Sequence, residues 1–448
     1  MRYIILFLIC SGMAQAAQFN VSLKDAEASV LAADSRYKAA RLSALAAAAA
    51  ADASGSLLNP RFTLEGNLRY NEVVPSIAMP AALGGARALG DNWNYSVGPA
   101  VSWILFDGGA VRSGRHSALR SAAARGAEAD HAGRQAVLKA RTAYFQLQLA
   151  LERVYLIGEN LQLSLSQLKD IALGARTGAR SRLDEIRARQ ETTARKRDLL
   201  RARAELSATL RDFSFVTGLQ LPEDVSLPLD ARMAGKDYGS EEPASLLLRA
   251  EPYEAILSRL LPAAEGGLEQ EPPLVKAQQE AARAYSAAAS AYRAEKFPRV
   301  TLAARSSLDY PNGPNLYSFM QHSAGLALSL PLFESGRSLH REKESSFNAS
   351  AALERKNESA QAVKRDFNKA QDAYKALMAE QALNIDALDD AAEAAKLAYE
   401  AYKAGGGTWL DVENANLKAL QAKTTAALTN AEILLKLAVL DSLIGRGL

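Results

Sequence analysis

Side chains able to do chemistry are few in this chain and are scattered along it. The four histidines, His116, His131, His322 and His340, lack the spacing of a metal site. The sequence has neither a G-x-S-x-G nucleophile motif nor the glycine-rich loop with lysine that holds a phosphate. Its one cysteine is Cys10, so thiolate and disulfide chemistry are absent if the N-terminus is removed. We therefore expect no enzyme, no cofactor and no metal site.

Charged residues instead gather at two glycine-containing turns. The first turn carries five arginines beside two acids: Arg176, Arg180, Arg182, Arg187 and Arg189 beside Asp184 and Glu185. The second turn carries Asp411 and Glu413. Because carboxylates accept guanidinium groups bidentately, we hypothesise that Arg180 or Arg182 pairs with Asp411 or Glu413. The alternative is a solvated basic helix face.

The elements that position these turns are marked by a change of period. Apolar residues alternate up to Phe333 in the segment HSAGLALSLPLFESGR, as in a strand with one apolar face. Past Gly336 the pattern becomes helical. An earlier copy has Phe106 and Gly109 in the same places, each 227 residues before its counterpart, whereas Pro331 belongs to the second junction. The pattern predicts two strand-to-helix junctions.

The same offset of 227 residues relates the two turns, because it separates Gly178 from Gly405 and Asp184 from Asp411. The chain is therefore an internal duplication. We divide it into a first repeat at 17–218, an equatorial insertion at 219–272 and a second repeat at 273–448. Each repeat has a helix, then a β-hairpin (60–106 and 298–333), then a long helical hairpin (108–218 and 335–445).

The start of the chain has the pattern of a signal peptide at residues 1–16. Arg2 is the positive residue, Tyr3 to Cys10 the apolar core, and Ala14-Gln15-Ala16 the cleavage site. Lipid modification of Cys10 is the less favoured alternative, because bulky residues precede it. After this segment no apolar run approaches the ~20 residues of a transmembrane helix, so entry into a membrane would require strands.

Four segments of about 10 residues alternate between apolar and polar residues, and this is the length of a transmembrane strand. In the first, Phe62 and Leu64 face opposite to Arg61 and Thr63. Since a sheet needs roughly eight strands to close, one chain cannot span a membrane alone. Three chains would supply 12 strands, with apolar faces toward lipid and polar faces toward water. A soluble antiparallel sheet is the alternative.

Each hairpin is followed by a long proline-free segment, at 110–173 and at 338–403. Heptad spacing of residues such as Tyr144, Leu147, Leu151 and Val154 indicates coiled-coil pairing. Some 65 helical residues would make a rod of roughly 100 Å. The net charge of +3 in 448 residues gives no footprint for nucleic acid.

The sequence LPLFESGR, its weaker copy ILFDGGAV, and two glycine turns followed by Leu-Asp resemble the TolC-type outer membrane efflux protein family. The resemblance implies an α+β membrane protein of the Gram-negative outer membrane that extends into the periplasm. Two β-hairpins per chain would contribute to a trimeric 12-stranded barrel in lipid, and the coiled-coil helices would form a periplasmic tunnel. The implied partners are two further copies, a periplasmic adaptor protein and an inner-membrane pump of the RND or ABC type.

The resemblance also implies roles for individual residues. Tyr402 and Asp184 match the contact that closes the family's periplasmic gate, and Asp411 matches one of its constricting acids. Gly407 and Leu183 stand where the family has Arg and Thr, and Asn414 departs from the second acid, whose charge Glu413 would restore. Gly178 and Gly405 match the turns that dock the adaptor.

Two classes of function stay open at this point. The first is an exit duct for drugs, metals or proteins of type I secretion. The second is an exported structural coiled-coil protein of the envelope, which would explain the heptads and signal peptide. The duplicated strand-to-helix junction favours the first.

Overall fold

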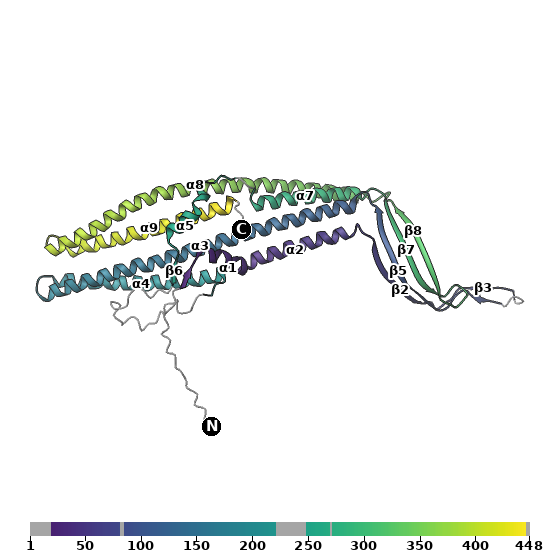
Figure 1. Ribbon diagram of the computed structural model, residues 1–448, viewed down its shortest axis with the longest axis horizontal. Helices are drawn as coiled ribbons and strands as arrows, with labels where there is room; N and C mark the ends of the chain where they lie inside the picture. Colours follow the sequence, from purple (N-terminus) through teal and green to yellow (C-terminus); the bar gives the residue numbers. More distant parts are fainter. Residues whose placement is uncertain (1–18, 81–84, 221–247, 269–270, 445–448) are drawn as a thin grey trace, which may run out of the picture. The chain divides into compact units, whose positions relative to one another are not determined.

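The computed structural model describes residues 19–80, 85–220, 248–268 and 271–444, and the chain divides into two compact units (Figure 1). Unit 1 comprises residues 1–39, 130–272 and 361–448, and unit 2 comprises residues 40–129 and 273–360. Both units take segments from both sequence repeats, because the helices α3 (Ala110–Arg176) and α8 (Arg337–Ala404) belong to both. The expected signal peptide at 1–16 lies outside the described residues.

Unit 2 contains an antiparallel sheet of four strands in the order β2-β5-β7-β8 (Figure 1). The strands are β2 (Arg61–Tyr70), β5 (Trp93–Phe106), β7 (Arg299–Tyr310) and β8 (Phe319–Ser329). The central pair, β5 with β7, joins the two repeats. A Cβ at Gly98 would lie 2.0 Å from the Ser306 carbonyl oxygen, so this pairing requires glycine there.

The register aligns apolar residues across the whole sheet. Phe62 is opposite Val101, and Trp103 is opposite Leu302, which in turn is opposite Leu326. These side chains share one face because alternate residues of a strand point the same way. The face is exposed in the single chain, with Phe62 at 75% and Leu326 at 69% of full exposure.

Two details of the strand regions differ from the sequence prediction. The strand β8 ends at Ser329 and not at Phe333, because Pro331 has no N–H to donate to a strand partner. The first hairpin loop holds a small hairpin of β3 (Ser76–Ile77) and β4 (Arg87–Ala88).

The helix expected over residues 21–58 is two helices, α1 (Leu23–Ala33) and α2 (Ser35–Ser56). Asp34 separates them, with an extended backbone and a carboxylate that accepts from the Tyr37 N–H at 2.8 Å. Short acidic side chains at a helix start satisfy free N–H groups in this way. In the second repeat the corresponding helix is α7 (Pro273–Ala294).

Unit 1 contains the turn-containing ends of two helical hairpins, in which α3 is followed by α4 (Arg182–Thr217) and α8 by α9 (Trp409–Ile444). Its core is built from heptad positions of these helices. The largest fully buried side chains of this core include Tyr144, Leu147, Phe213, Ile433 and Leu437.

The insertion expected over residues 219–272 is described only in part. Its described part has a short strand β6 (Leu248–Ala250) besides the helices α5 (Tyr253–Leu260) and α6 (Pro262–Glu265). The strand pairs in parallel with β1 (Phe19–Val21), which the sequence pattern did not indicate.

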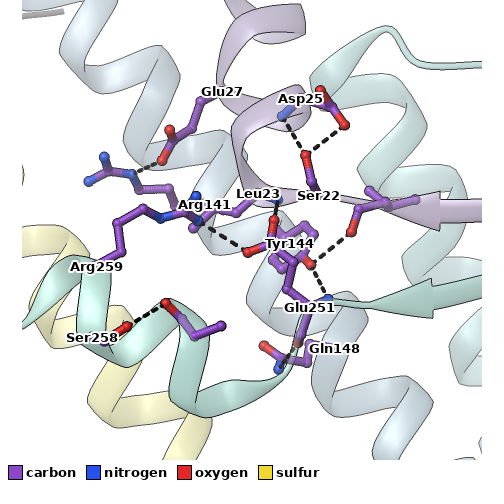
Figure 2. Close-up of polar contacts among 12 residues, drawn as sticks. Ser22, Leu23, Asp25, Glu27, Arg141, Tyr144, Gln148, Glu251, Ser258 and Arg259 are labelled. Atoms are coloured by element: carbon purple, nitrogen blue, oxygen red, sulfur yellow. Dashed lines mark hydrogen bonds and ion pairs between the residues drawn. The ribbon is translucent and has the colours of Figure 1, made fainter.

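Tyr144 of α3 connects both short strands (Figure 2). Its hydroxyl donates to the Val21 carbonyl at 2.9 Å and accepts from the Glu251 N–H at 2.8 Å. The Glu251 carboxylate accepts from the Leu23 N–H at 2.9 Å. Burial raises the pKa of Tyr144 to about 12, so the hydroxyl keeps the proton it donates.

We predict that Tyr144→Phe destabilises the protein by about 1–3 kcal/mol, because a buried carbonyl and a buried N–H both lose their partner. Thermal unfolding followed by circular dichroism measures the change. Tyr155→Phe is the control, since Tyr155 is 51% exposed and should change stability by less than about 0.5 kcal/mol. Equal melting temperatures for Tyr144→Phe and the unmodified chain would contradict the prediction.

Candidate functional site

The two turns between the long helices lie together in unit 1, and we refer to residues 177–181 and 405–408 as the paired turns. In the first, Gly178 has a left-handed backbone with φ of 78°, a conformation that glycine adopts without strain. The N–H groups of Ala179 and Arg180 both donate to the Gly174 carbonyl, at 2.8 and 3.1 Å. The Ser181 side chain caps α4.

The second turn follows the same logic with different residues. Gly405 has φ of 84°, which ends α8. Thr408 and Asp411 then cap α9 reciprocally, because the Asp411 carboxylate accepts from the Thr408 N–H at 3.0 Å and from its hydroxyl at 2.6 Å. The Thr408 hydroxyl and N–H lower the pKa of Asp411. Asp411 is therefore ionised and engaged in a cap within its own turn.

Arg180 joins the two turns. Its guanidinium donates to the carbonyl oxygens of Tyr402 at 2.9 Å and Lys403 at 2.7 Å. The same group stacks over the Tyr402 ring, 4.4 Å from its centroid. Carbonyls at a helix C-terminus lack partners within the helix and carry partial negative charge, so they attract a cation. A Cβ at Gly174 would lie 2.5 Å from Arg180 Cγ, so this glycine leaves room for the arginine.

The hypothesis that Arg180 or Arg182 pairs with Asp411 or Glu413 is wrong within the chain. Arg180 uses backbone carbonyls and an aromatic ring, as described above. Arg182 pairs at 2.5 Å with Glu185, three residues along its own helix. A partner one helical turn away needs no approach of distant segments, which explains the preference.

Tyr402 and Asp184, the two residues expected at the gate, do meet. The Tyr402 hydroxyl lies 3.4 Å from the Asp184 carboxylate, and the Tyr402 residue is 4% exposed. Burial raises the pKa of Tyr402, and Asp184 raises it further, so the phenol stays protonated and donates.

Trp409 belongs to this site, although the sequence pattern did not single it out. It is 1% exposed and packs edge-on against Tyr402 with ring centroids 5.6 Å apart. Its position directly after a glycine-rich turn was the available signal. The small apolar cluster around the two rings also contains Ile171, Ala188 and Val412.

Glu191 lies one layer further along α4, with 4% exposure and both carboxylate oxygens buried without a hydrogen-bond partner. Burial raises its pKa to about 7, and the negative charge of Glu413 on α9 contributes, while Arg195 opposes. Sequence reasoning missed Glu191 because an isolated glutamate in an arginine-rich helix reads as solvent-exposed. Glu413 therefore acts on a neighbouring acid and not on Arg180 or Arg182.

The residues of the strand-to-helix junctions lie in unit 2 and take no part in the paired turns. At the first junction, after Phe106, the Asp107 carboxylate accepts from the N–H groups of Gly109 and Val111 at 2.9 and 2.7 Å. Gly109 has φ of 89°, which reverses the chain into α3. At the second, Gly336 has φ of 79° and Phe333 is 88% exposed.

This arrangement can hold two helical turns together, and nothing in it resembles a reaction centre. Among the residues that the structure describes, no three His, Cys, Asp or Glu side chains lie close enough to bind a metal ion. None of the described helices has the length and apolar character needed to cross a membrane.

The sequence matches the family model described as outer membrane efflux protein over residues 29–219 and 267–446. No curated protein sequence matches the chain.

Three solved structures share the fold. CmeC, an outer membrane channel of Campylobacter jejuni, is 15% identical with a TM-score of 0.72, covering 94% of this chain and 85% of that one. VceC, an outer membrane protein of Vibrio cholerae, is 18% identical with a TM-score of 0.71 and coverages of 94% and 95%. MtrE, an outer membrane channel of Neisseria gonorrhoeae, is 20% identical with a TM-score of 0.70 and coverages of 94% and 88%.

We predict that Glu191→Gln stabilises the protein at pH 8 by roughly 2 kcal/mol and changes little at pH 5. The folded-state pKa of about 7 exceeds the ordinary value of 4.5, so the unmodified chain loses stability as pH rises between these values. The amide cannot ionise and avoids this loss. Thermal melts at both pH values measure it.

The control is Glu205→Gln, an acid on the same helix whose side chain is 53% exposed. Its substitution should leave the pH dependence of melting as it is in the unmodified chain. A Glu191→Gln variant that keeps the full pH dependence would show that this carboxylate is not the group responsible.

Proposed function

This chain belongs to the outer membrane efflux protein family, and from that premise we propose that it is the exit duct of a tripartite system. It is an outer membrane protein. In the proposed system an inner-membrane pump passes substrates to this channel, which carries them across the periplasm and the outer membrane. The observation that carries the proposal is the continuous apolar face of the four-stranded sheet, which is exposed in the single chain.

The sheet supports assembly of three copies. Its outer strands, β2 and β8, each have only one neighbour in the sheet. In lipid an unpaired strand edge leaves N–H and C=O groups without partners, at several kcal/mol for each group. If β8 of one copy pairs with β2 of the next, three copies form a closed barrel of 12 strands. Every edge is then satisfied.

The other face of the sheet suits a water-filled interior. Ser96 donates to Asp309 at 2.5 Å and accepts from Arg305 at 2.7 Å. These residues lie on neighbouring strands, β5 and β7. A charged network of this kind is costly against hydrocarbon and stable against water.

We assign the paired turns to the periplasmic end, where they close the channel and dock a periplasmic adaptor at Gly178 and Gly405. The contact between Arg180 and Tyr402 holds the closed state, supported by Tyr402 with Asp184. Both pump types, RND and ABC, remain compatible with this role, as do drugs, metals and proteins of type I secretion as substrates. No bond is made or broken by the channel.

We predict that Arg180→Ala opens the channel, because two charge-assisted hydrogen bonds and a cation–π contact are lost. The open probability in planar bilayers should rise about tenfold or more, the equivalent of about 1.4 kcal/mol. The protein is purified in detergent, and its native mass is measured beside its single-channel conductance.

Arg176→Ala is the matched control, because Arg176 ends α3 beside the same turn and makes none of the contacts with α8 described above. It should keep the small, mostly closed currents of the unmodified trimer. A folded trimer without conductance in all variants would favour the alternative of a structural envelope protein. A monomer would contradict the barrel.

A further inference from the structure

The outward side of α4 is basic. Arg182, Arg189, Arg197 and Arg201 are exposed and follow one another at spacings of seven, eight and four residues, which keeps them on one side of a helix. The buried residues of α4, such as Ala188 and Leu199, lie on the opposite side. We call the four arginines the basic face.

The outward side of α8 is acidic over its last turns in unit 1. Between residues 380 and 400 the helix has six carboxylates and one lysine. Asp386, Asp390, Glu393 and Glu400 are exposed on one side, and we call them the acidic face. Two exposed leucines lie among them, Leu383 at 69% and Leu397 at 55% of full exposure. A solvated helix has no need of such leucines, so this side has the composition of a contact surface.

The two faces lie at matching distances from their turns. The turns themselves are level, because Tyr399 donates to Asp170 at 2.9 Å, and these residues precede Gly405 and Gly178 by six and eight positions. Counted from the same glycines, the charges of the two faces then match in pairs. Arg182 with Glu400 lie four and five residues away, Arg189 with Glu393 lie 11 and 12, and Arg197 with Asp386 both lie 19.

Symmetry brings these levels together. Rotation about an axis parallel to the helices keeps every residue at its height, so α4 of one copy can meet α8 of the next with each arginine opposite a carboxylate. Such a head-to-tail contact is heterologous and closes when the rotation completes a ring. Within a copy, α4 and α8 run along opposite borders of the helices of unit 1 in Figure 1.

We propose that the basic face of α4 and the acidic face of α8 form the interface between neighbouring copies of this chain along the helices. The inference rests on the proposed trimer and adds which surfaces meet and in what order. Arg182 and Arg189 already bracket Glu185 of their own helix at 2.5 and 2.6 Å, so each has further donors for a carboxylate of the neighbour. Leu383 and Leu397 become buried in the same contact.

The test is a charge swap at the matched pair Arg197 and Asp386. Arg197→Asp and Asp386→Arg should each weaken the trimer, because like charges then face each other at every interface. With about a fivefold effect at each of three identical interfaces, trimer dissociation should be favoured about a hundredfold. The double variant should recover most of the loss. Dissociation is followed by native mass spectrometry in detergent across a urea series at low salt.

Lys418→Asp is the control, since it reverses an exposed charge on α9 at a similar distance from the turn. It should leave the midpoint of dissociation unchanged. Salt at 1 M should reduce the difference between the unmodified chain and the single reversals, since screening acts on exposed ion pairs.

A second experiment fixes the order of the copies and does not depend on stability. One chain carries Arg197→Cys and a co-expressed chain carries Asp386→Cys, both with Cys10→Ser, so a bismaleimide of about 10 Å can link only different chains. A covalent dimer from the mixture, and none from either chain alone, supports the interface. A stable trimer that is insensitive to both reversals and forms no link contradicts the inference while leaving the channel intact. An unmodified chain that is no trimer contradicts the proposed function itself.

Discussion

The backbone of the two outer strands imposes the main constraint on this protein. A strand pairs through N–H and C=O groups on both of its sides, and β2 and β8 each use one side within the chain. Water can satisfy the free side, and hydrocarbon cannot. An outer membrane protein of this kind therefore depends on further copies, and the apolar face that spans all four strands gives those copies a common orientation toward lipid. The requirement for several copies follows from hydrogen bonding before any helix is considered.

The helices adapt to the same requirement. Because α3 and α8 each continue from a strand through a glycine junction, the position of a helix in an assembly is set by the strand it follows. The outward sides of α4 and α8 must then be suitable for neighbouring copies, and their opposite charges fit that need. Electrostatic complementarity of this kind specifies order and register more than affinity.

The paired turns solve a different problem, which is to hold two helix ends together in a reversible way. Arg180 uses backbone carbonyls that every helix end provides, so the contact needs no specific side chain on α8 beyond the Tyr402 ring. A few hydrogen bonds and one ring contact can be broken at modest cost. A closure built this way can open without unfolding the helices. The nearby Glu191 adds a dependence on pH to the same region.

The sequence alone determined the features that depend on local patterns. Alternation along 61–70 and heptads from Tyr144 onward reflect repeats of the backbone itself, and glycines such as Gly178 mark positions that only a flexible residue fills without strain. The tertiary structure decided what depends on distant segments. It joined β5 to β7 at Gly98, gave Arg180 the carbonyls of residues 222 and 223 positions away, and buried Glu191 beside Glu413. A spacing in sequence carries no information about such contacts, because their geometry is set by the packing of whole helices and strands.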